Sequence, residues 1–363
     1  MHNNSKSTKE PLFHIVKRDT IVSWKAILIR IIAVLAAIVL CSLIVYIGGN
    51  ANPVSYFSSM FKGAFGTVNL TWSFLYSAAI LLCIAIAVTP AFKMRFWNIG
   101  AEGQVLMGGL AATACMFYMG DKVSLPVLYI IMTLASVITG AVWAVIPAIF
   151  KAKWNTNETL FTLMMNYVAI QIISFFIDTW VKDGSGTLKP MHEYGFPTIH
   201  NKWFLNIVIV LIITVIIYIY LKYSKHGYEI SVVGESENTA RYIGINVKKV
   251  IIRTMLVSGV LCGIAGLIIC GGMNHTISTG SAGGRGFTAI LVSWLAKFNP
   301  LYMILTSLLL VFFQVGALQV STDLGIDDIS DITTAIILFF IVGCEFFINY
   351  KIVLRRSHKE DIK

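Results

Sequence analysis

Long apolar runs separated by short polar segments dominate the pattern along this chain. Because an α-helix needs about twenty residues to cross the hydrocarbon of a bilayer, each long run predicts a transmembrane helix. There are ten runs, at residues 26–47, 70–88, 97–118, 126–149, 159–181, 204–222, 251–271, 286–298, 301–320 and 330–350. The eighth is short and follows the glycine-rich HTISTGSAGGRG, so a re-entrant helix and a full crossing are both open there. The pattern predicts an all-α polytopic membrane protein with about ten transmembrane helices.

Lys and Arg gather in alternate loops, and this indicates the orientation of the chain. Lys and Arg are frequent in residues 1–25, 222–253 and 351–363. The loops that would lie on the opposite side of the membrane hold only isolated basic residues. Cytoplasmic segments carry an excess of Lys and Arg, so we expect a cytoplasmic tail at each end and a cytoplasmic loop at 222–253. The transmembrane domain then covers residues 26–350. Residues 1–25 lack the short apolar core of a secretory signal.

Composition supports the membrane class and excludes several others. A chain with 57% hydrophobic and 13% charged residues does not fold around one soluble core. The net charge of +10 follows the loops without a continuous basic face, so we expect contact with membrane lipid and no nucleic-acid partner. The six cysteines form no CxxC pair, which argues against a zinc site. Phosphate-loop, HExxH and GxSxG motifs do not occur, so we expect neither an enzyme nor a bound cofactor or metal.

The basic loop 222–253 contains the signature of a short helix. Ser236 is a good N-cap, Glu237 falls in the first turn and Gly244 provides a stop, which predicts a helix over residues 236–243. A structured element between two membrane spans indicates a cytoplasmic docking surface. Contact of a basic loop with anionic lipid is the alternative.

The predicted orientation places the two halves of the domain in opposite senses. Spans two to five begin by running inward and spans seven to ten by running outward, so the halves are a possible inverted repeat. Each half opens its second span with a glycine-rich polar segment, at residues 97–109 and 282–294. Discontinuous helices at matching positions are typical of a transport pathway.

Polar side chains inside the predicted spans are candidates for that pathway, because such groups are costly in hydrocarbon. Glu102 either lines a polar path or lies near the cytoplasmic interface, where it simply caps or pairs with Lys93 or Arg95. Asn166 and Gln171 lie five residues apart on one predicted helix and face different sides. Only one of the two amides can therefore point easily at a shared pore, and hydrogen bonds between helices are the other use for either.

Two further patterns predict local structure. Asn155 and Glu158 have the spacing of a capping box at the start of the fifth span. Gly259, Gly263 and Gly266 in the seventh span favour a close helix contact.

Four segments of the sequence resemble bacterial ABC-transporter permeases of the branched-chain amino acid, simple sugar and nucleoside group, in the same order and spacing. They are NIGAEGQ at 98–104, NETLFTLMMNYVA at 157–169, GYEISVVGESENTARYIGINV at 227–247 and GRGFTAILVSWLAKFNP at 284–300. Within the group, the chain is most similar to the larger permease of nucleoside importers that use a basic-membrane-protein type lipoprotein. The resemblance implies a multi-pass subunit of the bacterial cytoplasmic membrane that moves nucleosides by ATP-driven alternating access.

The same resemblance implies partners and site residues. The partners are a cytoplasmic ABC ATPase, which hydrolyses the ATP, a second homologous permease in a heterodimer, and a substrate-binding lipoprotein. The residues expected to couple to the ATPase are Gly227, Tyr228, Glu229, Gly234, Glu235, Ala240, Arg241, Gly244 and Ile245. Ser231 departs from the pattern, because many relatives have a basic residue there. The residues expected along the translocation pathway are Asn98, Glu102, Gln104 and Asn166 by resemblance, and Phe287 by its chemistry.

Two alternatives remain open. An importer of sugars or other small solutes fits the same sequence, because the binding protein largely sets specificity in such systems. A secondary transporter that works alone would need an acid inside the membrane, for which Glu102 and Glu345 are the candidates. We expect Glu345 to snorkel toward the basic tail that begins at Lys351.

Overall fold

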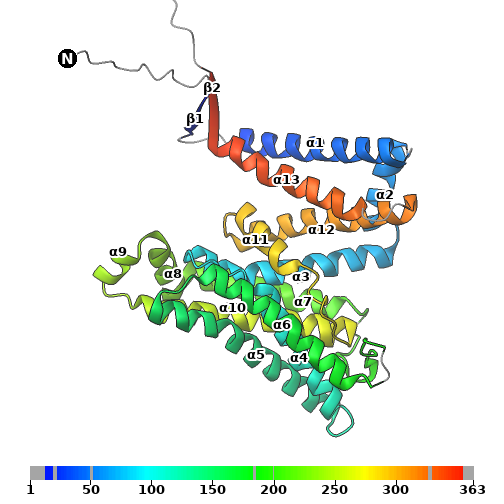
Figure 1. Ribbon diagram of the computed structural model, residues 1–363, viewed down its shortest axis with the longest axis vertical. Coiled ribbons are helices and arrows are strands. Elements are labelled where there is room, and N and C mark those ends of the chain that lie inside the picture. Colours follow the sequence, from blue (N-terminus) through cyan, green and yellow to red (C-terminus); the bar gives the residue numbers. More distant parts are fainter. Residues whose placement is uncertain are drawn as a thin grey trace, which may run out of the picture. The chain divides into compact units, whose positions relative to one another are not determined.

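A computed structural model describes residues 13–18, 23–49, 52–182, 185–198, 200–325 and 329–354. Helices make up most of this part of the chain, from α1 to α13, as predicted for an all-α polytopic protein (Figure 1). The contacts divide the chain into two compact units. One unit comprises residues 1–63 and 313–363, and the other comprises residues 64–312.

In the first unit, α1 (Ser23–Gly49) packs side by side with α13 (Ile329–Asn349) (Figure 1). A charged pair joins the two helices: Arg30 donates from Nε and Nη2 to Oε1 of Glu345 at 2.9 and 2.6 Å. The prediction that Glu345 reaches toward Lys351 is therefore wrong. The guanidinium of Arg30 on the neighbouring helix offers two donors to the carboxylate of Glu345. The Glu345 side chain therefore does not have to extend along its own helix to reach a charged partner.

A two-stranded antiparallel ribbon lies where the sequence predicted only tails. Strand β1 (Phe13–Lys17) pairs with β2 (Tyr350–Leu354). Five-residue strands in short mixed segments carry too little alternation to be found from the pattern. The rest of the predicted tails 1–25 and 351–363, except Arg18 and the first turn of α1, lies outside the described residues.

The first unit also contains most of α2 (Pro53–Phe65) and the second half of α12 (Pro300–Leu324). The short helix α2 was not predicted. Glycines let it lie against α12: a Cβ on Gly63 would come within 2.7 Å of the Val315 carbonyl oxygen, and one on Gly316 within 2.6 Å of Met60 Cγ. Ser59 Oγ donates to Asp323 at 2.6 Å across the same contact.

The second unit is a helix bundle with the remaining elements. They are α3 (Val68–Lys93), α4 (Ala101–Met119), α5 (Leu125–Trp154), α6 (Glu158–Trp180), η1 (His192–Tyr194), α7 (Phe204–Tyr223), α8 (Lys225–Glu235), α9 (Glu237–Tyr242), α10 (Val247–Ile269), η2 (Cys270–Asn274) and α11 (Arg285–Leu295). Helices α3 and α10 are buried along most of their length, whereas α5, α6 and α7 expose broad apolar faces. Such faces suit a lipid or protein environment within a membrane.

Close contacts between glycines hold the centre of this bundle, as the sequence predicted for α10. A Cβ on Gly259 would lie 2.4 Å from the carbonyl oxygen of Gly140 in α5. On the other side, a Cβ on Gly108 of α4 would lie 2.6 Å from Cα of Gly263. Since the absence of side chains lets helix backbones approach, α4, α5 and α10 form one tightly packed group.

Eight helices in the described part of the chain are long and apolar enough to cross a membrane: α1, α3, α5, α6, α7, α10, α12 and α13. The other two predicted spans differ. Helix α4 begins at Ala101 rather than residue 97 and carries Glu102 and Gln104 in its first turn. Helix α11 has 11 residues, which gives about 16 Å at 1.5 Å per residue, roughly half of the ~30 Å hydrocarbon. Of the two possibilities left open for the eighth span, the short α11 favours a re-entrant helix, whereas α4 is a continuous helix of 19 residues.

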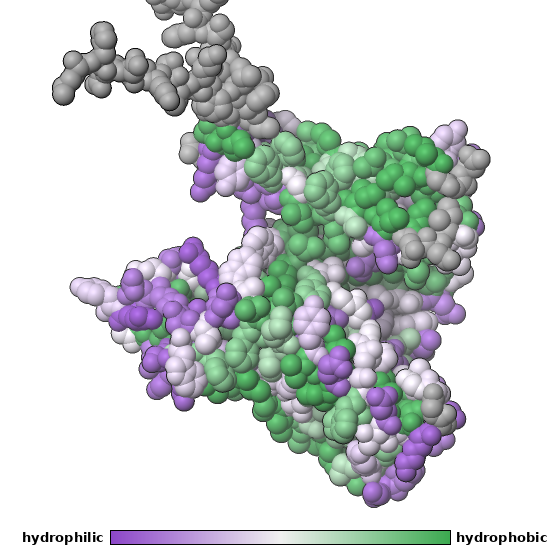
Figure 2. Space-filling model, viewed as in Figure 1, coloured by the Kyte–Doolittle hydropathy of each residue, from purple (hydrophilic) through white to green (hydrophobic). Residues whose placement is uncertain are grey.

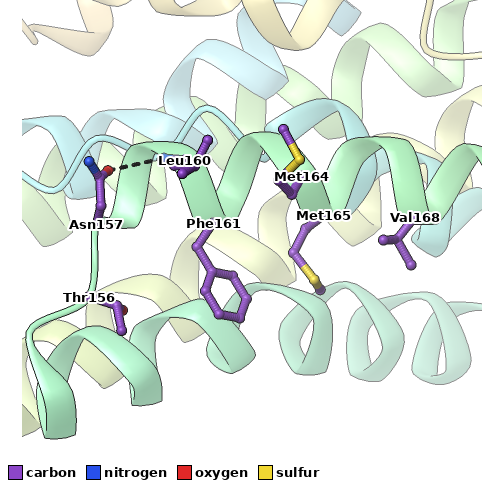
Figure 3. Close-up of a pocket in the computed structure, with 7 residues that line it drawn as sticks. All are labelled: Thr156, Asn157, Leu160, Phe161, Met164, Met165 and Val168. Atoms are coloured by element: carbon purple, nitrogen blue, oxygen red, sulfur yellow. Dashed lines mark hydrogen bonds between the residues drawn. The ribbon is translucent and has the colours of Figure 1, made fainter.

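The start of α6 corrects a local prediction. Asn157, rather than Asn155, is the N-cap: its Oδ1 accepts a hydrogen bond from Leu160 N at 3.1 Å (Figure 3). Asn155 ends α5 in the left-handed conformation with φ of 52°. Glu158 pairs with Lys151 at 2.9 Å. Glu158 is thus the first residue of α6 and not the third, which a capping box requires, and each asparagine terminates one helix.

Candidate functional site

Two short helices, α8 and α9, fill the polar loop between α7 and α10. The predicted helix at residues 236–243 is confirmed as α9, with Ser236 Oγ accepting from Thr239 N at 3.2 Å. Gly244 follows it with φ of 86°, which only glycine adopts readily. The preceding helix α8 was not predicted. It begins after Ser224, whose Oγ accepts from Gly227 N at 3.0 Å.

Helix α8 is fixed to the bundle by close backbone contacts and one ion pair. Gly234 lies so near the end of α3 that a Cβ would come within 2.1 Å of the Lys93 carbonyl oxygen. A Cβ on Gly227 would come within 2.4 Å of the Leu221 carbonyl oxygen near the end of α7. Glu229 accepts from Arg253 of α10 at 2.7 Å, and both side chains are largely buried. A displacement of α8 therefore has to move the ends of three long helices with it.

The outer side of α8 and α9 is exposed and mostly hydrophilic (Figure 2). Tyr242 at the end of α9 is 94% exposed, and Tyr228 of α8 is 62% exposed. Arg241 pairs with Glu237 at 3.0 Å on the surface. Exposed tyrosine and arginine side chains are common anchors in protein interfaces. The surface of α8 and α9 is therefore suited to docking a protein.

The remaining residues of this predicted surface divide into exposed and buried groups. Glu235 is exposed, whereas Ala240 is the buried residue of α9 and its carbonyl accepts a backbone hydrogen bond from Ile245 N at 2.9 Å. Ser231, which departs from the family pattern, donates from Oγ to the Gly227 carbonyl at 3.0 Å within α8. Beside α9, a polar groove lies between the end of α5 and the start of α10, lined by basic residues that include Lys153 and Lys248.

A buried amide network lies just before α4. Asn98 is fully buried, and its Nδ2 donates to Ser258 Oγ of α10 at 3.2 Å. Gln104 Nε2 donates to Asn98 Oδ1 at 3.0 Å, and Gly100 N donates to the same oxygen at 3.1 Å. The network satisfies the polar groups where the chain turns from α3 into α4. It thereby allows a non-helical turn between α3 and α4 inside the bundle.

Glu102 of α4 joins this helix to the short helix α11. Its Oε1 accepts from Gly284 N and its Oε2 from Gly286 N, each at 2.7 Å. The side chain is buried, and among the described residues it forms no ion pair with Lys93 or Arg95. A carboxylate at a helix N-terminus satisfies free N–H groups and opposes the helix dipole. Glu102 of α4 is therefore the cap of α11, a partnership that spacing along the sequence cannot reveal.

Asn166 and Gln171 face different sides of α6, as the sequence predicted. Asn166 is buried and uses both ends of its amide: Oδ1 accepts from Gly103 N at 2.8 Å and Nδ2 donates to the Ile99 carbonyl at 2.9 Å. Gln171 is exposed. Phe287 on α11 is 45% exposed. The structure thus brings Asn98, Glu102, Gln104 and Asn166 into one buried region, and their place along a translocation pathway stays a prediction.

Two helix contacts near the glycine-rich openings are related in the way that the predicted halves would be. Helix α4 packs on α10, and α11 packs on α3, and these two contacts exchange when the two halves are exchanged. The inverted repeat itself stays a prediction.

The long apolar helices, the short helix α11 joined to α4 by Glu102 and the hydrophilic surface of α8 and α9 together indicate a multi-pass membrane protein. Residues 70–342 match the family described as branched-chain amino acid transport system / permease component, and the chain belongs to this family. It is therefore a permease component of an ABC importer, a subunit class without enzymatic activity of its own.

Relatives with assigned transport roles cover most of the chain. It is 28% identical over 330 residues to the guanosine ABC transporter permease protein of Bacillus subtilis, which covers 87% of this chain and 93% of the relative. It is 27% identical to the glucose ABC transporter permease protein of Haloferax volcanii, with 92% of each chain covered. A nucleoside ABC transporter permease protein of Lactococcus lactis is 25% identical, covering 87% of this chain and 91% of the relative.

Proposed function

We propose that this chain forms the translocation pathway of a bacterial nucleoside importer, in the cytoplasmic membrane with both termini in the cytoplasm. Guanosine and nucleoside permeases among its relatives support this solute class. A glucose permease is similar to a comparable degree, so sugar transport is the second candidate. The excess of Lys and Arg in the loop that forms α8 and α9 supports the orientation.

The observation that carries the proposal is the rigid attachment of α8 together with the exposed end of α9. We propose that this surface docks a separate ATPase subunit. Energy reaches the pathway only if the ATPase binds two permease conformations with different affinities. A surface tied to the ends of α3, α7 and α10 meets this need, because docking cannot shift it without shifting those helices.

The further partners are a second permease subunit and a substrate-binding lipoprotein on the opposite side of the membrane. The broad apolar faces of α5, α6 and α7 offer room for a second permease. Within the chain, we propose that Asn98, Glu102, Gln104 and Asn166 border the pathway by fixing the starts of α4 and α11. Phe287 on α11, with its exposed ring, is proposed to contact the solute directly.

The contacts of two acids argue against a secondary transporter that works alone. Such a protein needs a carboxylate that binds and releases a cation or proton as it moves. Glu102 holds two backbone N–H groups of α11, and Glu345 holds Arg30. Both carboxylates thus have fixed structural partners. This favours the ATP-driven subunit.

Uptake of radiolabelled nucleosides and pentoses, in cells that carry the permease with its co-encoded subunits, tests the proposal. Two variants of the docking surface are compared with wild type: Arg241→Glu reverses an exposed charge, and Gly244→Pro forbids the φ of 86°. Gly186→Pro is the matched control, because Gly186 also has positive φ and open space around it but lies in another loop.

We expect nucleoside uptake in wild type and in Gly186→Pro, and its loss in both docking variants while the permease remains in the membrane. Uptake that persists in Arg241→Glu and Gly244→Pro, or that needs only this chain and a proton gradient, would overturn the ATP-driven reading. Uptake of pentoses alone would favour the sugar candidate.

A further inference from the structure

The basic groove beside α9 has no role in the proposed function. It has a volume of about 240 Å³ and lies between the last turn of α5, α9 and the start of α10. Its charged lining residues are Lys151, Lys153, Glu237, Arg241 and Lys248. Four cations and one acid thus surround a hollow that is open to solvent.

The acid and two of the cations are already paired. Glu237 accepts from Arg241 at 3.0 Å on α9, so these two charges cancel at the edge of the groove. Lys151 pairs with Glu158 of α6 at 2.9 Å, and both side chains are largely buried. These four residues therefore leave the groove close to neutral, and its charge depends on the remaining cations.

Lys153 and Lys248 give the groove a surplus of positive charge. Both are exposed, and neither forms an ion pair among the described residues. Lys153 belongs to α5 and Lys248 to α10, so the two charges converge from helices that are remote in sequence. Arg95, equally unpaired in the described part of the chain, lines a smaller hollow of about 60 Å³ that shares Lys151 with the groove. Because like charges repel, an anion placed among these cations is stabilised.

The helix ends at the groove do not change its sign. Helix α10 begins there at Val247 and contributes the positive end of its dipole, whereas α5 ends there at Trp154 and contributes the negative end. These two partial charges are of similar size and opposite sign. The side chains therefore decide which ions the groove attracts.

The size and depth of the groove favour a phosphate group. Its volume is below the roughly 300–1,000 Å³ of pockets that enclose whole small molecules, so a small charged group fits while the rest of its ligand stays outside. Lysine binds phosphate as a point charge. Trp154, beside Lys153, is 63% exposed, and tryptophan is enriched at the level of the lipid headgroups. The phosphates of a bilayer lie at that level.

We propose that this groove binds a phosphate group between Lys153 and Lys248, next to Arg241. An anionic phospholipid and a soluble phosphate compound present the same oxygens to these cations. A bound phosphate joins α5 and α10 to α9, in which Ala240 alone is buried among the six described residues. It therefore fixes α9 to the bundle. The site is independent of the transported solute, and only its effect on ATPase docking rests on the proposed function.

Binding to the purified full-length permease tests the site. The ATPase is left out, so that nucleotide-binding groups of that subunit do not contribute. Native mass spectrometry counts bound phosphatidylglycerol, with phosphatidylcholine, which has no net charge, as the control lipid. The melting temperature with inorganic phosphate is compared with that in chloride at equal ionic strength, because general screening of charges is then the same. We expect binding of at least one of the two phosphate probes.

Two neighbouring lysines provide a matched pair of variants. Lys248→Gln removes a cation of the groove, and we expect the affinity for the bound probe to fall about fivefold, equivalent to about 1 kcal/mol. Lys249→Gln removes the same charge from the next residue of α10, which is also exposed but does not line the groove. Its effect should stay below twofold. Lys153→Gln should resemble Lys248→Gln.

The outcomes identify the source of the phosphate or overturn the site. Binding of phosphatidylglycerol that Lys248→Gln weakens more than Lys249→Gln assigns a lipid headgroup, and the same dependence with inorganic phosphate alone assigns a soluble ligand. Absence of binding by both probes, or equal effects of the two variants, overturns the site. If neither probe binds but Lys248→Gln weakens ATPase association, the groove belongs to an acidic segment of the ATPase, and the site is again overturned. Since no step measures uptake, failure of the site leaves the proposed function standing.

Discussion

Removing the carboxylate of Glu102 is the sharpest test of how α4 and α11 are held together. Glu102→Ala deletes both acceptors for Gly284 N and Gly286 N at the start of α11. Glu102→Gln keeps one oxygen acceptor but turns an NH₂ group toward the other backbone donor. The backbones of Gly286 and Glu102 already lie close together, because a Cβ on Gly286 would lie 2.5 Å from Glu102 N. No other group therefore has space to replace the lost carboxylate.

The size of the effect follows from the two hydrogen bonds. A hydrogen bond to a charged group contributes about 1.5–3 kcal/mol, so Glu102→Ala should lower the free energy of unfolding by roughly 3–6 kcal/mol. Glu102→Gln loses one bond and should cost about half as much. At roughly 2 °C per kcal/mol for a protein of this size, the Ala variant should melt roughly 6–12 °C below wild type.

Thermal unfolding of the purified permease in one detergent measures these differences. The expected order of melting temperature is wild type, then Glu102→Gln, then Glu102→Ala. Equal melting temperatures for all three proteins would show that the carboxylate does not hold α11. An unchanged melting temperature together with lost uptake would instead identify Glu102 as a group that acts on the solute or on a transported cation.

Three further predictions concern packing, an ion pair and pH. Gly263→Ala should destabilise the protein by about 1–3 kcal/mol, because its Cβ would lie 2.3 Å from the Ser136 carbonyl oxygen. Gly343→Ala, with nothing within 4 Å, should change the melting temperature little. A double-mutant cycle of Arg30→Ala and Glu345→Ala should give a coupling free energy of about 1 kcal/mol, and a value of zero would mean that the pair contributes nothing. Burial and the nearby His192 lower the pKa of His275 below its usual value. Protonation is therefore disfavoured in the folded state, and stability should be lost as pH falls below about 6.5. His275 contacts the 185–198 loop, because its carbonyl accepts from Met191 N at 2.8 Å and its ring lies 5.1 Å from that of His192. Proteolysis of this loop should therefore rise as pH falls below about 6.5 in wild type but not in His275→Asn.

The membrane spans and α9 could be predicted from the sequence because each depends on local pattern. A run of about twenty apolar residues defines a span whatever its neighbours are. Ser236 and Gly244 mark the two ends of α9 through their own backbone and side-chain preferences. The same holds for the close contact made by Gly259 and Gly263.

The missed features depend on partners far apart in the chain. Glu102 binds backbone groups at 284 and 286, and Glu345 binds Arg30 of the first long helix. The pairing of β1 with β2 is equally remote. Helix α8 was missed for another reason: its contacts with the bundle are made by Gly227 and Gly234, and glycine in a sequence usually argues against a helix.

The pairing of Arg30 with Glu345 has a consequence for how the protein is made. Helix α1 enters the bilayer during synthesis long before α13 leaves the ribosome, so its guanidinium starts without the carboxylate that it finally contacts. A lone arginine in a span is costly to insert. Interfacial water, lipid headgroups or a chaperone must therefore solvate or pair the guanidinium of Arg30 until α13 is inserted. A product truncated before α13 would keep this unsatisfied charge, a mark by which quality control could distinguish it from the finished permease.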